Sequence, residues 1–161
     1  MTDLSTTNVF SIRPMIPSDF PLLAAWMVET PLWQRYHLTT AKAISQFEAG
    51  LERGDWLITA DGKSPACGFG WGIPRGTFGR SPYLRLIGVR PDLTGSGLGA
   101  LLLSEIERRA AEVASDLFLL VSDFNEGAQR FYKKHGFEAI GAIPGYVLPD
   151  VTELIFRKTL R

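Results

Sequence analysis

A short glycine-rich segment, Gly95-Ser96-Gly97-Leu98-Gly99, combines residue types and spacing that suggest chemistry. It follows an apolar, strand-like run at residues 83–89 and precedes a helical run from Leu98 to about Ala114. Glycines let a backbone approach a ligand closely, and the first turn of a helix directs free N–H groups and the positive end of its dipole at an anion. The segment therefore predicts a phosphate-binding loop.

A second segment whose residues could take part in chemistry follows another apolar run, residues 116–122. Asn125 can cap a helix that ends at Gly136. Ala128 lies one turn into this helix, and Tyr132 lies about two turns in, near the same face. A helix start of this kind beside the glycine loop would bring Asn125 and Tyr132 close to one ligand.

The elements that must position these segments follow from hydrophobic periodicity and turn residues. Strands are predicted over residues 10–13, 55–60, 66–73, 83–89, 116–122, 139–143 and 153–159. Helices are predicted from residue 18 or 19 to before Pro31, from Thr40 to near Gly54, from 98 to about 114, and from 125 to 135. Residues 74–82 are predicted to form a loop rich in glycine and arginine. The order indicates a mixed α/β (α+β) fold.

The composition is typical of one globular domain spanning residues 1–161. Seventeen basic residues balance 17 acidic ones, so the charge does not point to nucleic acid or to an anionic membrane. No apolar run approaches the roughly 20 residues of a membrane span, and the polar N-terminus does not resemble a secretory signal. Cys67 is the only cysteine, which excludes an intramolecular disulfide. We expect a cytoplasmic protein without a metal site.

Together the two segments resemble the GNAT superfamily of acetyl-CoA-dependent N-acetyltransferases. The family's loop, Gln/Arg-x-x-Gly-x-Gly/Ala, falls on residues 94–99, and its later signature, Asn-x-x-Ala-x-x-Phe-Tyr-x-Lys-x-Gly-Phe, falls on residues 125–137. The order of elements also matches along nearly the whole chain. The resemblance implies a GNAT-type acyl-CoA N-acyltransferase fold, in which helices flank a mixed central sheet with two splayed parallel strands, here residues 83–89 and 116–122.

The resemblance also implies the site. Acetyl-CoA would lie between the splayed strands, and Tyr132 would protonate the departing thiolate, since a phenol with a pKa of about 10 stays protonated at neutral pH. The cofactor contacts implied in this way are Ile87, Gly88, Val89, Thr94, Gly95, Ser96, Gly97, Leu98, Gly99, Asn125, Ala128, Phe131 and Lys134. Thr94 replaces the family's usual Gln or Arg, so we expect somewhat weaker cofactor affinity.

The implied function is transfer of an acetyl group to a primary amine by direct attack, and we expect a small-molecule acceptor. Trp33, Tyr36 and Tyr146 are expected to border it. The general base stays open among the residues Glu29, His37, Asp123 and Glu153 and a chain of waters. Homodimers are frequent in the family, so the resemblance leaves a homodimer open.

Three other interpretations are kept. The chain could be a non-catalytic domain that binds or senses acyl-CoA, or an acetyltransferase acting on a protein N-terminus or lysine. A dinucleotide-binding domain is the third, because Gly95, Gly97 and Ala100 satisfy G-x-G-x-x-G/A and Asp123 follows at roughly the ribose-binding distance. We rank this one lower, because two helices and a hairpin precede the loop and too little chain follows it to complete a doubly wound sheet.

Overall fold

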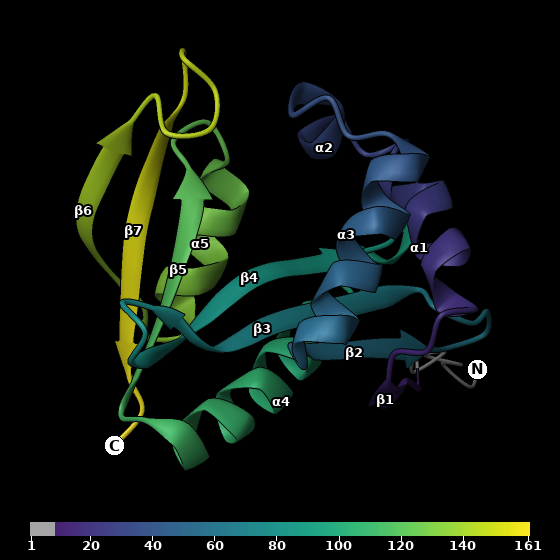
Figure 1. Cartoon of the computed structure of the whole chain (residues 1–161), viewed down its shortest axis with the longest axis horizontal. Helices are drawn as coiled ribbons and strands as arrows, with labels where there is room; N and C mark the ends of the chain where they lie inside the picture. The colour runs from purple at the N-terminus through teal and green to yellow at the C-terminus, as the bar shows by residue number, and fades with distance from the viewer. Residues whose placement is uncertain (1–8) are drawn as a thin grey trace, which may run out of the picture.

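A seven-stranded mixed sheet in the order β1-β2-β3-β4-β5-β7-β6 forms the centre of the computed structural model, which describes residues 9–161 (Figure 1). The strands are β1 (Ser11–Pro14), β2 (Trp56–Asp61), β3 (Gly68–Thr77), β4 (Ser81–Val89), β5 (Asp116–Ser122), β6 (Glu138–Pro144) and β7 (Thr152–Thr159). The helices are α1 (Asp19–Met27), α2 (Pro31–Arg35), α3 (Thr40–Arg53), α4 (Leu98–Val113), α5 (Glu126–Lys134) and the 3₁₀ turn η1 (Pro91–Leu93). This arrangement confirms the predicted mixed α/β class.

The chain after α1 differs from the sequence prediction. The sequence predicts a helix that ends before Pro31, and α1 does end before it, at Met27. The short helix α2, which begins at Pro31, was not predicted. A proline suits the first helical position because its φ is already fixed near the helical value and its missing N–H has no partner there. The aromatic segment that follows α1 is therefore partly helical, which fixes the direction of its side chains.

The predicted loop at residues 74–82 also differs. Most of it extends β3 and β4, and residues 78–80 alone lie outside the two strands. The register of β3 against β4 shifts between Ile73 and Thr77, so the proline and glycine there lie in an irregular part of the hairpin where the strand pairing is interrupted. These residue types indicated a turn, but the neighbouring strand keeps the segment extended.

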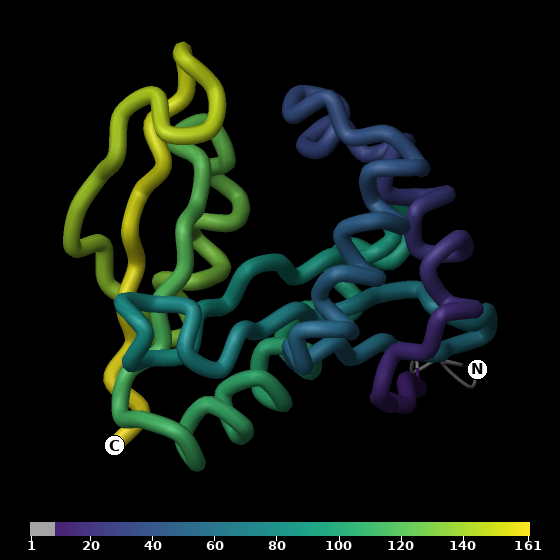
Figure 2. The backbone as a smooth tube through the Cα atoms, viewed as in Figure 1, coloured from purple at the N-terminus to yellow at the C-terminus, as the bar shows by residue number. Residues whose placement is uncertain are grey.

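The predicted splaying of the two parallel strands is confirmed. β4 and β5 pair at Tyr83 with Phe118 and at Leu84 with Leu119, and their register extends no further. Beyond these pairs residues 85–89 and 120–122 diverge. Figures 1 and 2 show β2, β3 and β4 running across the view, whereas β5, β6 and β7 stand steeply against them. The sheet therefore opens at the carboxyl ends of β4 and β5.

Two apolar clusters cover the two faces of the sheet. On one face, α1, α2 and α3 pack onto side chains of β2 and β3 such as Leu57, Phe69 and Trp71. On the other face, α4 buries Leu102 and Ile106 against the neighbouring strands. Because adjacent residues of a strand point to opposite faces, the two clusters interleave along β2 and β3. The start of α4 is thereby held at the open end of β4.

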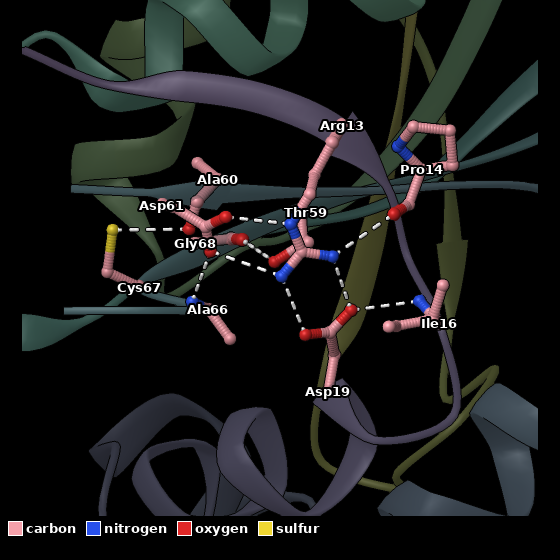
Figure 3. A network of polar contacts seen from close by, with 10 residues as sticks. All are labelled: Arg13, Pro14, Ile16, Asp19, Thr59, Ala60, Asp61, Ala66, Cys67 and Gly68. Atoms are coloured by element: carbon pink, nitrogen blue, oxygen red, sulfur yellow. Dashed lines mark hydrogen bonds and ion pairs between the residues drawn. The ribbon is translucent and has the colours of Figure 1, made fainter.

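A polar network ties the N-terminal strand to the first helix (Figure 3). Arg13 donates to both oxygens of Asp19 at 2.8 Å and to Asp61 at 2.7 Å. The guanidinium holds the pKa of both carboxyls below the usual value. The backbone N–H groups of Ile16 and Ala66 complete the contacts of these carboxylates. The network is far from the open end of the sheet and we assign it to stability.

None of the helices formed by residues 9–161 is long and apolar enough to cross a membrane.

Candidate functional site

A pocket of about 510 Å³ lies where the end of β4 meets the starts of α4 and α5. Its lining residues come from these three elements and the loop before α4, namely Ile87, Val89, Leu93, Thr94, Gly95, Gly97, Leu98, Gly99, Ala100, Gly127, Ala128, Phe131, Tyr132, Lys134 and His135. The two segments that the sequence singled out, about 30 residues apart, thus form one cavity.

The glycine loop has the backbone geometry that the sequence predicted. Gly95 and Gly97 adopt φ values of +82° and +88°, which side chains other than glycine rarely tolerate. The left-handed turn at Gly97 directs the chain into α4, where the first hydrogen bond of the helix runs from Leu101 N to Gly97 O. Within the described chain the backbone N–H groups of Gly99 and Ala100 make no such bond, so they are available to an anion.

The start of α5 lies directly beside this loop. A Cβ placed on Gly99 would stand 3.5 Å from Phe131 Cζ, so the two helices meet at that ring. Asn125 caps α5 by accepting a hydrogen bond from Ala128 N at 3.2 Å. Tyr132 packs edge-on against Phe131 and Phe137 and faces the pocket. The helix therefore presents an apolar wall with a phenol in it.

Most of the predicted cofactor residues line the pocket, and three do not. Gly88 is buried in β4, Ser96 accepts a hydrogen bond from Leu98 N within the loop, and Asn125 uses its side-chain oxygen for the helix cap. Conversely, Leu93, Ala100, Gly127 and His135 line the pocket but were not among the predicted site residues. Sequence reasoning could have found His135, because it lies about one turn beyond Phe131 on the same helix.

Tyr132 is poised to stay protonated. Burial raises the pKa of its phenol well above the usual value of 10, and the nearby Tyr83 phenol raises it further. Tyr132 Oη has no hydrogen-bond partner among the described residues. None of their fully buried side-chain oxygens lacks a partner, so Tyr132 Oη is not fully buried, and Tyr132 lines the pocket. A protonated phenol with a free oxygen is a suitable general acid.

A second polar cluster crosses the open end of the sheet. Tyr36, directly after α2, places its Oη 2.5 Å from Glu153 Oε1 on β7 and 2.5 Å from Ser122 Oγ at the end of β5. Burial, followed by the hydrogen bond to Glu153, raises the pKa of Tyr36 to about 12. Arg35 also reaches across, since its guanidinium lies 3.8 Å from the centre of the Phe124 ring and 3.8 Å from Asp150.

The three residues expected around the acceptor lie in different surroundings in the structure. Trp33 is only 8% exposed and packs with Trp26 and Phe69 behind β4, so most of its ring belongs to the core and its contact with an acceptor stays a prediction. Aromatic density in the sequence did not reveal which face of α2 would be buried. Tyr36 lies at the open end of the sheet, and Tyr146 is exposed in the loop between β6 and β7.

The four candidate bases differ in their exposure to solvent. Glu29, His37 and Asp123 are exposed, whereas Glu153 is 5% exposed. Tyr83, which the sequence did not single out, lies between the two parts of the site. The pKa of its phenol is raised by burial and by the charge of Glu153, and the same phenol acts on the pKa of Tyr132. The sequence pattern of a strand does not indicate that one of its tyrosines lies between two parts of a site.

Comparison with protein families now assigns the chain. Residues 20–137 match the model of the acetyltransferase (GNAT) family, so the chain belongs to that family. Acetyl-CoA is the cofactor of these acetyltransferases. The alternative of a dinucleotide-binding domain is wrong, because the sheet is not doubly wound and Asp123 lies outside the pocket.

Solved structures agree on the fold. An aminoglycoside 6'-N-acetyltransferase complexed with coenzyme A is 16% identical, with a TM-score of 0.78 over 94% of this chain and 97% of that one. A ribosomal-protein-alanine N-acetyltransferase from Brucella melitensis is 22% identical, with a TM-score of 0.76 over 92% and 99%. YncA from Salmonella typhimurium, solved with its cofactor acetyl-CoA, is 17% identical, with a TM-score of 0.76 over 95% of each chain. Comparison with curated protein sequences gives no match.

Proposed function

We propose that this chain transfers the acetyl group of acetyl-CoA to a primary amine of a small molecule, with Tyr132 as the general acid. The observation that carries the proposal is the Tyr132 phenol, which lines the pocket, has no hydrogen-bond partner among the described residues, and has a raised pKa. A domain that only bound acyl-CoA would have no need of a free, protonated donor at this point.

The pocket fits the cofactor in shape and in donor groups. The free N–H groups at the start of α4 would hold the pyrophosphate, and Lys134 on the pocket wall would add positive charge. Residues 85–89 of β4 have an edge that β5 leaves unpaired, which suits an extended amide chain. Acetyl-CoA would supply an acetyl group activated by its bond to sulfur.

The residues of the chain would polarise the acetyl group, orient the amine and move protons. The backbone N–H groups of β4 would polarise the acetyl carbonyl, and holding the amine in place would contribute much of the rate gain. The amine would lose one proton to a base, which stays open among Glu29, His37, Asp123, Glu153 and a chain of waters. Tyr132 would donate its proton to the sulfur as the amine displaces it, and its raised pKa keeps that proton available throughout the neutral range. No covalent enzyme intermediate is needed.

The test is the Tyr132→Phe variant, which removes the phenolic oxygen and keeps the ring. Thiol release from acetyl-CoA is measured across a panel of amines, and the affinity for CoA is measured by calorimetry. We expect turnover to fall by roughly 10²- to 10⁴-fold, the usual contribution of a general acid, with little change in the Kd of CoA. Equal turnover in both proteins would refute the role of Tyr132. Tight CoA binding by the wild type without thiol release from any acceptor would favour a sensing domain.

The preference for a small acceptor has a separate basis. The two comparison enzymes named for an aminoglycoside and for a ribosomal-protein alanine have nearly equal TM-scores, so fold similarity does not choose between acceptor classes. In this chain Tyr36 bridges to the end of β5 and to β7, and Arg35 contacts Phe124 and Asp150 in the loops after β5 and before β7. These contacts would cross the acceptor side of the sheet, which favours a small acceptor. Comparing kcat/KM for free amines with that for peptides tests this preference, and faster acetylation of peptides would reverse it.

A further inference from the structure

Glu153 is a buried carboxylate that lacks a cation. It is 5% exposed, and within residues 9–161 no Lys, Arg or His nitrogen lies within 4.0 Å of it. Arg35, the nearby candidate, is turned to Phe124 and Asp150 instead. Burying a carboxylate without a counter-ion is costly, so proteins rarely retain one unless a ligand or partner supplies the positive charge.

The hydrogen bonds around Glu153 keep it an acceptor. Tyr36 has a single hydroxyl proton, and a carboxylate can only accept, so this proton points at Glu153 Oε1. Ser122 must then donate its own proton to Tyr36 Oη. Both donors are thereby committed, and neither neutralises the charge of the carboxylate.

The second oxygen of this carboxylate is open. Tyr36 is its hydrogen-bond donor within the described part of the chain, and it contacts Oε1. No buried side-chain oxygen of that part lacks a partner. Oε2, which has none there, is therefore not fully enclosed by the described residues.

Glu153 also faces the correct side of the sheet. Glu153 and Ser122 are opposite each other in the register of β7 and β5, so their side chains share a face. Leu119 and Val121 belong to the cluster with α4 and α5, hence Ser122 points to the opposite face. The cofactor pocket lies on the helix side, and Glu153 lies across the opening from it.

Phenols lie near this position. Tyr36 touches the carboxylate, and Tyr83 and Tyr146 lie near enough that the charges of Glu153 and Tyr146 both affect the pKa of Tyr83. The Tyr83 phenol in turn affects Tyr132 on the other side of the opening. A carboxylate among aromatic rings is a favourable environment for an alkylammonium ion, through ion pairing and cation–π attraction.

We propose that Glu153 binds the acceptor amine as its ammonium cation, so that the acceptors are basic alkylamines rather than arylamines, which are neutral at pH 7. For acetyl transfer the bound ammonium ion would give one proton to Glu153, which frees the nitrogen lone pair for attack on the acetyl carbonyl. The assignment of this cation as an acceptor rests on the proposed acetyl transfer, whereas the binding of the cation does not.

The experiment measures binding rather than turnover. The full chain, loaded with CoA, is titrated with phenethylammonium and separately with 2-phenylethanol, its neutral analogue, and amide NMR shifts at residues 36, 122 and 153 give the Kd. The variants are Glu153→Gln, which can still accept the Tyr36 hydrogen bond, and Glu138→Gln, which removes an exposed carboxylate from β6 of the same sheet. Tyr36→Phe is the third variant, because it removes the hydrogen bond but keeps the charge.

We expect wild type and Glu138→Gln to prefer the ammonium ion over the alcohol. Glu153→Gln should raise the Kd of the ammonium ion about tenfold or more, equivalent to about 1.4 kcal/mol, and leave the Kd of the alcohol unchanged. Tyr36→Phe should keep the preference. Equal affinity of wild type for the two probes, or unchanged ammonium binding in Glu153→Gln, would overturn the proposal. So would an equal loss in Tyr36→Phe, since the cluster would then be merely structural.

Failure of the proposed function has a different signature. Saturable ammonium binding that depends on Glu153, without thiol release from acetyl-CoA, would overturn acetyl transfer and leave the cation site in place.

Discussion

Replacing Gly88 by alanine tests how β4 is held beside the pocket. A Cβ at this position would stand 2.8 Å from Trp33 Cη2 and would also collide with the ring of Phe69. Neither ring can move freely, because Trp33 is 8% exposed and Phe69 is fully buried. Phe69 packs edge-on against Phe47 with ring centres 5.3 Å apart. The added methyl group must therefore push β4 or distort the aromatic cluster.

The expected magnitude follows from two opposing effects. Overpacking a core costs about 1–3 kcal/mol, and replacing a glycine within a strand returns roughly 0.5–1 kcal/mol. We expect Gly88→Ala to lose about 1–2 kcal/mol in the free energy of unfolding, which lowers the Tm by about 2–8 °C for a chain of this length. Because residues 85–89 form one wall of the opening, the affinity for CoA should also fall.

The assay is guanidinium unfolding followed by circular dichroism, together with calorimetric titration of CoA. Gly141→Ala on β6 is the matched control, since its Cβ would meet Ile155 Cδ1 at an ordinary 3.4 Å. We expect the control to be as stable as the wild type or more stable by up to about 1 kcal/mol, because it gains the strand preference of alanine without a clash. If Gly88→Ala is as stable as Gly141→Ala, the close packing of Trp33 and Phe69 on β4 is refuted.

Three further predictions concern other parts of the molecule. Arg13→Met leaves Asp19 buried without its cation and should cost about 3 kcal/mol in guanidinium unfolding, whereas Arg108→Met on the exposed face of α4 should change stability by less than about 1 kcal/mol. Since Asp19 has a lowered pKa in the folded protein, the stability it contributes is present above about pH 4 and lost as the pH falls further, so the difference between wild type and Arg13→Met should shrink in acid. Gly97→Ala meets no atom but strains a φ of +88°, so it should destabilise by about 1–2 kcal/mol and weaken CoA binding; an unchanged Kd would argue against the loop as the phosphate site. The Cys67 thiol is fully buried with a raised pKa, so a disulfide reagent should modify it at pH 8 only after unfolding.

Local features of this fold were predictable from the sequence. The glycine loop, the capped helix at Asn125 and the strands on either side depend on short-range preferences for turns, caps and periodicity. The positive φ at Gly95 and Gly97 is such a case, because few other residues could occupy those positions. The splaying of β4 and β5 entered only through the resemblance, since no local pattern states where two paired strands part.

Contacts between distant segments were not predictable in the same way. Tyr36 and Glu153 are separated by 117 positions, and neither lies in a motif. An acidic residue in the apolar run of β7 was a weak signal, but it did not distinguish Glu153 from three exposed alternatives. Trp33 shows the same limit, because aromatic composition suggested a binding surface but did not indicate that the turn into α2 would bury most of the ring.

A crystal structure of the chain with CoA tests the central claim most directly. We expect the pyrophosphate to lie at the N–H groups that begin α4 and the pantetheine arm to lie along residues 85–89. The sulfur should be within hydrogen-bonding distance of Tyr132 Oη. CoA bound at another surface, or β4 and β5 paired along their full length with the Tyr132 phenol turned away from the sulfur, would contradict it.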